Sequence, residues 1–214
     1  MLQYITDAPE ACGRDIPTQV KAVLDGGCRW VQLRMKEASH DEILAMAREI
    51  KPLCDEKEAY LVINDHVDIC KEANASGVHL GKTDMLPSKA RIALGPLAII
   101  GVTANTFEDV KAVGALDIDY VGIGPFAMTS TKKNLAPVLG LEGEEQICRR
   151  MESEGMLFPR VAVGGIQLDD IEPLMTAGAN GVAVCGAISR SEDMAETTRA
   201  FVATLDDCLK KLEK

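Results

Sequence analysis

The chain has 214 residues, of which 47% are hydrophobic and 26% are charged, and this suits one globular domain with a sizeable core. Its formal net charge of −10 repels polyanions at long range, which argues against nucleic acid and anionic membrane surfaces as partners. Seven cysteines without any C-x-x-C pair, together with no signal peptide and no long apolar run, predict a cytoplasmic protein with reduced thiols.

Short apolar runs alternate with amphipathic stretches along the chain. The apolar runs are predicted to be strands, at Leu2–Thr6, Trp30–Arg34, Ala59–Asn64, Gly77–Leu80, Ala98–Val102, Tyr120–Gly124, Arg160–Gly164 and Gly181–Cys185. Between them, three- and four-residue spacing of apolar residues predicts helices such as Asp41–Cys54, Pro87–Leu94 and Phe107–Leu116. Eight evenly spaced βα units favour a closed (β/α)8 barrel, a TIM barrel, with a single catalytic domain over residues 1–214.

The second predicted strand ends in two cations, within Gln32-Leu33-Arg34-Met35-Lys36. Functional groups of such barrels lie where strands end, and alternation sends Gln32, Arg34 and Lys36 to one side. Leu33 and Met35 then face the other side. Because unpaired buried charge is heavily penalised, the two cations either bind an anionic ligand or form salt bridges with acids at the rim.

Two carboxylates follow the next two strands, Asp65 directly after Asn64 and Asp84 after the fourth strand. Mg²⁺ prefers one or two carboxylates, water and the phosphate oxygens of a substrate. Either aspartate alone is more commonly a helix N-cap. The two together on adjacent loops favour a metal site.

The loop after the sixth strand carries three hydroxyls and two lysines, in the segment Thr129-Ser130-Thr131-Lys132-Lys133. Hydroxyls and backbone N–H groups donate hydrogen bonds and lysine supplies charge, so the segment is typical of an anion receptor. The same composition also occurs in solvated surface loops, and that alternative stays open.

Glycines follow the seventh and eighth strands, at Gly164-Gly165 and at Gly186 after Cys185. The loops after these two strands are the usual phosphate site of a (β/α)8 barrel. The sequence thus predicts two anion sites on one face, one with a metal and one without. Two small phosphorylated substrates would fit them.

Five ordered motifs resemble the thiamine-phosphate synthase family. They are Gln32–Lys36, Ile63–Asp65, Val78–Asp84, Gly124–Lys132 and Gly164–Ile166. The resemblance implies a transferase of thiamine biosynthesis that couples 4-amino-2-methyl-5-pyrimidinylmethyl diphosphate with thiazole phosphate and releases diphosphate. It also implies Mg²⁺ as cofactor, bound by Asp65 and Asp84, and catalytic roles for Arg34, Lys36 and Lys132.

The same resemblance implies the substrate-binding residues. They are Gln32, Leu33, Arg34, Met35, Lys36, Asn64 and Thr103 for the pyrimidine diphosphate, with Lys132 also meeting the diphosphate, and Thr129, Ser130, Thr131, Gly165, Cys185 and Gly186 for the thiazole phosphate. The chain departs from the family pattern at three positions. Thr103 and Gly186 each replace a serine, and Asn105 replaces a common histidine.

Three other functions compete with this interpretation. A related thiazole tautomerase would need an acid or base near neutral pKa, commonly histidine at the position of Asn105. A Schiff-base aldolase would use Lys36 or Lys132 as nucleophile, and a non-catalytic barrel would keep only the phosphate loops. The sequence leaves open whether the thiazole is carboxylated and whether the chain forms a homo-oligomer.

Overall fold

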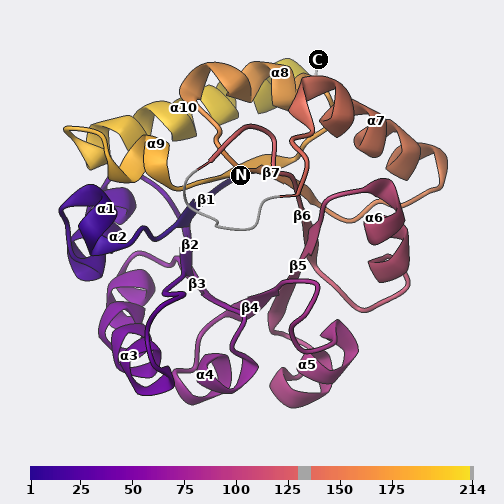
Figure 1. The fold of residues 1–214 in the computed structure, drawn as a ribbon. Coiled ribbons are helices and arrows are strands. Elements are labelled where there is room, and N and C mark those ends of the chain that lie inside the picture. Colours follow the sequence, from indigo (N-terminus) through magenta and orange to yellow (C-terminus); the bar gives the residue numbers. More distant parts are fainter. Residues whose placement is uncertain (130–135, 213–214) are drawn as a thin grey trace.

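The eight apolar runs pair side by side as parallel strands and close into a barrel (Figure 1). The computed structural model describes residues 1–129 and 136–212. The strands are β1 (Leu2–Ile5), β2 (Trp30–Leu33), β3 (Tyr60–Asn64), β4 (Gly77–Leu80), β5 (Ile99–Ala104), β6 (Tyr120–Ile123), β7 (Arg160–Val163) and β8 (Gly181–Val184). Because β1 pairs with both β2 and β8, the sheet has no free edge. The predicted fold class is therefore confirmed.

The helices surround the strands as an outer ring (Figure 1). They are α1 (Pro9–Cys12), α2 (Ile16–Asp25), α3 (His40–Glu56), α4 (Val67–Glu72), α5 (Pro87–Leu94), α6 (Phe107–Val113), α7 (Gly140–Ser153), the 3-10 helix η1 (Leu168–Asp170), α8 (Ile171–Thr176), α9 (Gly186–Ser189) and α10 (Met194–Leu212). The predicted end of α6 at Leu116 is wrong, because Gly114 terminates the helix and its N–H binds Val110 O. No helix in residues 1–129 and 136–212 combines the length and apolarity that a membrane crossing requires.

Two apolar clusters lie between the strands and the helices. A smaller third cluster lies inside the barrel and forms its floor. The smaller cluster consists of Trp30, Val62, Tyr120, Val161 and Ala183. The Trp30 and Tyr120 rings meet edge to face with centroids 4.7 Å apart. The Tyr120 ring also occupies the space in which a side chain at Gly101 would lie, since a Cβ there would be 2.0 Å from its Cζ. This floor leaves open space at the carboxyl ends of the strands.

Candidate functional site

A cavity of about 870 Å³ opens above this floor, at the carboxyl ends of the strands. Most of the predicted site residues line it. They are Gln32, Arg34, Lys36, Asn64, Asp65, Asp84, Thr103, Thr129, Gly165, Cys185 and Gly186. These residues come from the carboxyl ends of strands and from the loops that follow them, so closure of the barrel brings them together.

Two predicted substrate-binding residues lie elsewhere. The Leu33 side chain is buried in the core between the strands and the helices, and Met35 packs against the same core. Neither residue lines the cavity. Ser130, Thr131 and Lys132, and the neighbouring Lys133, lie outside the described residues.

The carboxylates of Asp65 and Asp84 meet beside Lys36. The Lys36 ammonium forms an ion pair with Asp65 Oδ2, and the Gly81 N–H donates to Asp84 Oδ2 at 2.7 Å. Burial and a hydrogen bond with Asp65 raise the pKa of Asp84. Burial opposes ionisation of Asp65 too, but hydrogen bonds with Lys36 and Asp84 outweigh it and lower the pKa of Asp65. The opposite directions of the two pKa shifts favour ionisation of Asp65 over that of Asp84.

Neither carboxylate is a helix cap. The N-caps of α4 and α5 are His66 and Leu86, and neither helix has a side-chain cap hydrogen bond. Asp65 has a φ of 68°, a left-handed conformation that is uncommon outside glycine and that aspartate and asparagine adopt more readily than most residues.

The donor set of this pair fits Mg²⁺ better than a transition metal. Among residues 1–129 and 136–212, no group of three or more His, Cys, Asp or Glu side chains could hold a metal. A site with two carboxylates suits an ion that takes its other ligands from water and phosphate. Asp65 and Asp84 are therefore the residues of this cavity that could hold Mg²⁺.

A chain of hydrogen bonds crosses the floor of the cavity and links five strands. Gln32 Nε2 donates to Gln3 Oε1 at 3.2 Å, and Gln3 Nε2 donates to the Tyr120 hydroxyl at 3.1 Å. His79 Nδ1 lies 2.9 Å from that hydroxyl, and its Nε2 lies 2.9 Å from Thr103 Oγ1. Burial raises the pKa of Tyr120, which keeps its hydroxyl neutral. His79 is thus hydrogen-bonded through both ring nitrogens, and it also lines the cavity.

The loop after β6 is fixed against the loop after β7. Phe126 N donates to Val163 O, and Ala127 N donates to Gly164 O, both at 2.9 Å. Gly165 has a φ of 69°, and a Cβ on it would lie 2.7 Å from Met128 O. Only glycine allows both this conformation and this close approach. Thr129 is thereby held at the cavity rim.

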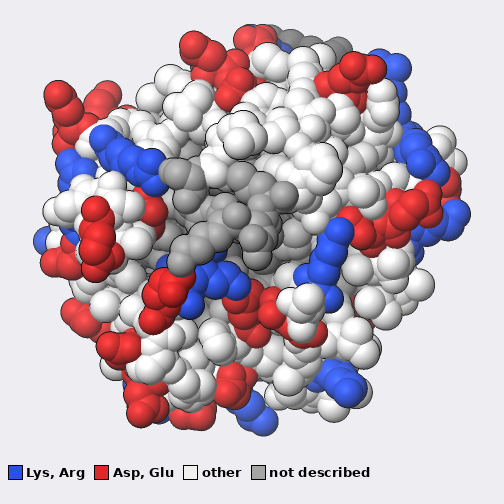
Figure 2. Space-filling model, viewed as in Figure 1, with Lys and Arg blue, Asp and Glu red and all other residues white. Residues whose placement is uncertain are grey.

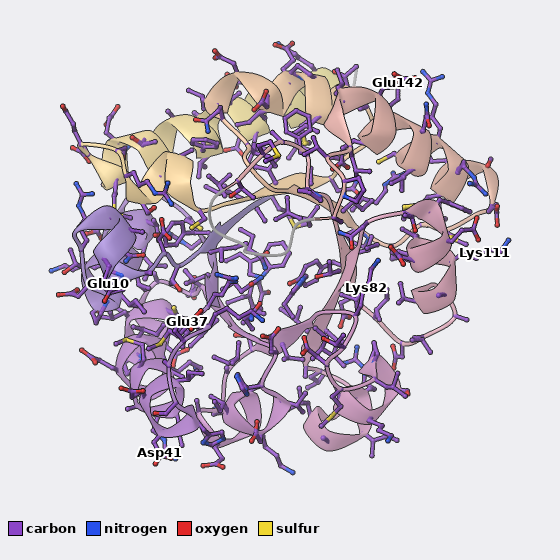
Figure 3. All side chains as sticks on the ribbon, viewed as in Figure 1. Glu10, Glu37, Asp41, Lys82, Lys111 and Glu142 are labelled. Atoms are coloured by element: carbon purple, nitrogen blue, oxygen red, sulfur yellow. The ribbon has the colours of Figure 1, made fainter. Side chains whose placement is uncertain are left out.

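Two basic residues that line the cavity were not predicted from the sequence. Lys82 lies within the Val78–Asp84 motif, and it forms an ion pair with Asp109 Oδ2 at 2.5 Å. Figure 3 shows Lys82 inside the ring of helices, whereas Lys111 lies outside on α6. Arg190 follows α9 and also lines the cavity. No motif marks Arg190 in the sequence, because its place depends on how β8 meets β1.

The cavity has two ends of different character. The charged end, after β2–β4, carries Arg34, Lys36, Asp65, Lys82 and Asp84. The glycine end, after β6–β8, carries Thr129, Gly164, Gly165, Gly186 and Arg190. Figure 2 shows basic side chains around the centre of this face and mostly acidic ones towards its outer edge. A parallel barrel with such a cavity at its carboxyl ends defines a (β/α)8 enzyme for anionic substrates.

Comparison with known proteins identifies the family. The model of the family described as thiamine monophosphate synthase matches residues 2–188. The chain is 50% identical over 201 residues to a thiamine-phosphate synthase of Bacteroides fragilis, covering 94% of this chain and 98% of that one. It is 53% identical over 179 residues to a thiamine-phosphate synthase of Bacteroides thetaiotaomicron, covering 84% and 86%. A solved structure titled thiamine phosphate pyrophosphorylase from Pyrococcus furiosus matches with a TM-score of 0.84 and 29% identity, covering 97% and 96%.

The chain belongs to the thiamine monophosphate synthase family. The resemblance seen in the five sequence motifs is confirmed. The predicted enzyme class, a transferase of thiamine biosynthesis, is confirmed with it.

Proposed function

We propose that the enzyme couples 4-amino-2-methyl-5-pyrimidinylmethyl diphosphate with thiazole phosphate, and that its products are thiamine phosphate and diphosphate. The observation that carries the proposal is the Asp65–Asp84 pair beside Arg34 and Lys36, in a cavity whose opposite end is built from glycine loops. Two phosphorylated substrates need two separate anion sites, and the two ends of the cavity supply them.

The charged end would bind the diphosphate. Asp65 and Asp84 would hold Mg²⁺, and Arg34 and Lys36 would donate to diphosphate oxygens. Bound Mg²⁺ supplies electrostatic stabilisation of the charge that the leaving diphosphate gains. Lys36 pairs with Asp65 in this structure, and it would donate to the diphosphate once Asp65 and Asp84 held the metal.

The floor would position the pyrimidine ring. Gln32 and Thr103 line the cavity, and the hydrogen-bond chain through Tyr120 and His79 fixes both side chains. Gln32 is only 2% exposed, so its amide has few alternative orientations. A fixed set of donors and acceptors orients a heterocycle at low entropic cost. Asn64, at the end of β3, completes this side of the cavity.

The glycine end would bind thiazole phosphate. Thr129, Gly165, Cys185 and Gly186 line it, and their hydroxyl and backbone N–H groups are suitable phosphate donors. Roles for Ser130 and Thr131 here, and for Lys132 at the diphosphate, remain predictions from the sequence.

The reaction breaks the C–O bond between the pyrimidinylmethyl carbon and diphosphate, and the thiazole nitrogen forms the new C–N bond to that carbon. Both electrons of the broken bond leave with diphosphate. The step needs no protein nucleophile and no general base, so positioning and electrostatics are what the chain must supply. The cavity supplies both.

The competing functions fit the cavity less well. Asn105, where a tautomerase would need an ionisable group, donates its amide to Gly124 O at 2.6 Å. An aldolase would need a free amine, but the Lys36 ammonium is held in the ion pair with Asp65. A non-catalytic barrel that binds only phosphate would have no use for two neighbouring carboxylates beside Lys36.

Other properties remain proposals. We expect one catalytic domain over residues 1–214 and a cytoplasmic location, which is supported by seven cysteines that form no disulfide. Light scattering after size-exclusion chromatography would measure whether the chain is a homo-oligomer.

The proposal is tested with purified protein and both substrates, with Mg²⁺ and with excess EDTA. We expect thiamine phosphate and diphosphate in equal amounts with Mg²⁺, and neither with EDTA. A reaction without thiazole phosphate measures hydrolysis of the donor. No thiamine phosphate in the presence of Mg²⁺ would contradict the proposal.

A further inference from the structure

The guanidinium of Arg190 lies directly over the backbone of Gly186 in the glycine end. A Cβ built on Gly186 would lie 3.4 Å from Arg190 Cζ and 3.5 Å from its Nε. The Arg190 N–H also donates to Gly186 O at 3.1 Å, which closes the turn of α9. The arginine and the glycine therefore share one corner of the cavity.

A buried carboxylate holds this guanidinium by one edge. Arg190 Nε lies 3.3 Å from Asp7 Oδ2, and the Asp7 side chain is only 4% exposed. Ser189 Oγ donates to the same oxygen at 2.7 Å, and Ala8 N donates to Asp7 Oδ1 at 3.1 Å. Asp7 is therefore fixed, and it fixes the orientation of the Arg190 fork. The side chain of Arg190 is still 42% exposed and lines the cavity.

The basic side chains that line the cavity are divided between its two ends. Among residues 1–129 and 136–212, the basic side chains that line the cavity are Arg34, Lys36, Lys82 and Arg190. The first three follow β2 and β4 and belong to the charged end. Within that described part of the chain, Arg190 is the basic residue at the glycine end.

We propose that Arg190 binds the phosphate of the thiazole substrate. The inference rests on the proposed function, because it assigns the ligand of the same cavity. A guanidinium presents planar, charged donors that match phosphate oxygens better than one hydroxyl does.

The test is calorimetric binding, which needs no turnover. Thiazole phosphate and the corresponding thiazole alcohol are each titrated into the protein, with Mg²⁺ and inorganic diphosphate present to fill the charged end. Arg190→Met is expected to weaken thiazole phosphate binding about 10- to 100-fold, as for loss of a charge-assisted hydrogen bond. Binding of the alcohol should not change. Arg190→Lys keeps the charge without the fork, and its loss should be smaller.

The matched control is Arg199→Met. Arg199 is exposed on α10 and pairs with Glu196, so this variant removes one positive charge from the same acidic protein away from the cavity. It should bind both ligands like the unchanged protein. Equal weakening of phosphate and alcohol by Arg190→Met would show a purely structural role and overturn the inference.

Two further results also decide it. If Arg190→Met weakened binding of carboxylated thiazole phosphate alone, Arg190 would be assigned to the ring carboxylate and the phosphate assignment would be overturned. The assignment would also be overturned if the unchanged protein did not bind thiazole phosphate. A selective loss for phosphate, in a protein that forms no thiamine phosphate in the coupling assay, would support Arg190 while the proposed function fails.

Discussion

The two ends of the cavity differ in the groups that line them. At the charged end, Lys36 pairs with Asp65 and Lys82 pairs with Asp109, and Asp84 lies beside Asp65. At the glycine end, backbone contacts set the shape, and the basic residue Arg190 pairs with the buried Asp7.

The difference shows how one acidic barrel handles two anions. At the charged end, a metal held by Asp65 and Asp84 would replace Lys36 as the partner of Asp65, and Lys36 would then be available to the diphosphate. The glycine end has a fixed outline, because a Cβ on either Gly164 or Gly165 would lie under 3 Å from the loop after β6. Substitutions at the charged end should therefore affect turnover, and those at the glycine end should affect binding of the second substrate.

The largest effect is expected for Asp65→Asn. Asparagine tolerates the left-handed backbone of this position but removes the charge that a metal needs. Turnover with Mg²⁺ should fall about 1000-fold, as for loss of a main electrostatic contribution. Steady-state rates over a range of Mg²⁺ concentrations, with a thermal melt to verify folding, measure it.

The control for Asp65→Asn is Asp41→Asn, at a fully exposed aspartate in the first turn of α3. Its turnover should match that of the unchanged protein. Full activity of Asp65→Asn at ordinary Mg²⁺ concentrations would refute the metal assignment.

An intermediate effect is expected for Gly165→Ala. The new methyl group would press on Met128 O, so the loop carrying Thr129 must shift. We expect the KM for thiazole phosphate to rise about 10-fold, as for a misplaced binding group, with the KM for the pyrimidine diphosphate unchanged. Varying each substrate in turn separates the two constants.

Gly155→Ala is the matched control for that prediction. Gly155 has a φ of 72°, close to the 69° of Gly165, but nothing lies within 4 Å of its added Cβ. Both variants thus carry similar backbone strain, and only Gly165→Ala crowds the cavity. A similar rise in KM for both would mean that strain, not crowding, is responsible.

The smallest effect on substrate binding at either end of the cavity is expected for Glu144→Gln on α7. Glu144 is 1% exposed, its Oε1 has no hydrogen-bond partner among the described residues, and burial raises its pKa to about 8. As pH rises above the ordinary value of 4.5, the unfolded chain ionises first. The buried, neutral Glu144 carboxyl therefore costs no stability below pH 4.5. The free energy of unfolding then falls as the pH rises from 4.5 to about 8.

Glu144→Gln should remove this loss and raise the free energy of unfolding at pH 8.5, with both KM values unchanged. Urea unfolding at pH 4 and pH 8.5 measures the change. Its neighbour Glu145 pairs with Arg149 on the helix surface, so Glu145→Gln should keep the pH dependence. An identical pH dependence in Glu144→Gln would show that this carboxyl group is not responsible.

Much of the site was predictable because the barrel places all strand ends on one face. Alternation along β2 correctly placed Gln32, Arg34 and Lys36 in the cavity and Leu33 away from it. The alternative of a salt bridge for Lys36 also holds, since its partner is Asp65. Tyr120 was missed because its hydroxyl meets Gln3 and His79 from other strands, and no local pattern encodes that meeting.

The sequence by itself determined the barrel, the family and the face on which the chemistry lies. Strand alternation and helical spacing are local properties, and each motif lies within a few residues of one strand end. Only the tertiary structure decided that Asp65 and Asp84 lie beside Lys36 and which arginine lines the glycine end. Arg190 meets Asp7 across 183 positions of the chain, because β8 closes on β1, and such long-range contacts depend on the closed barrel and not on neighbouring residues.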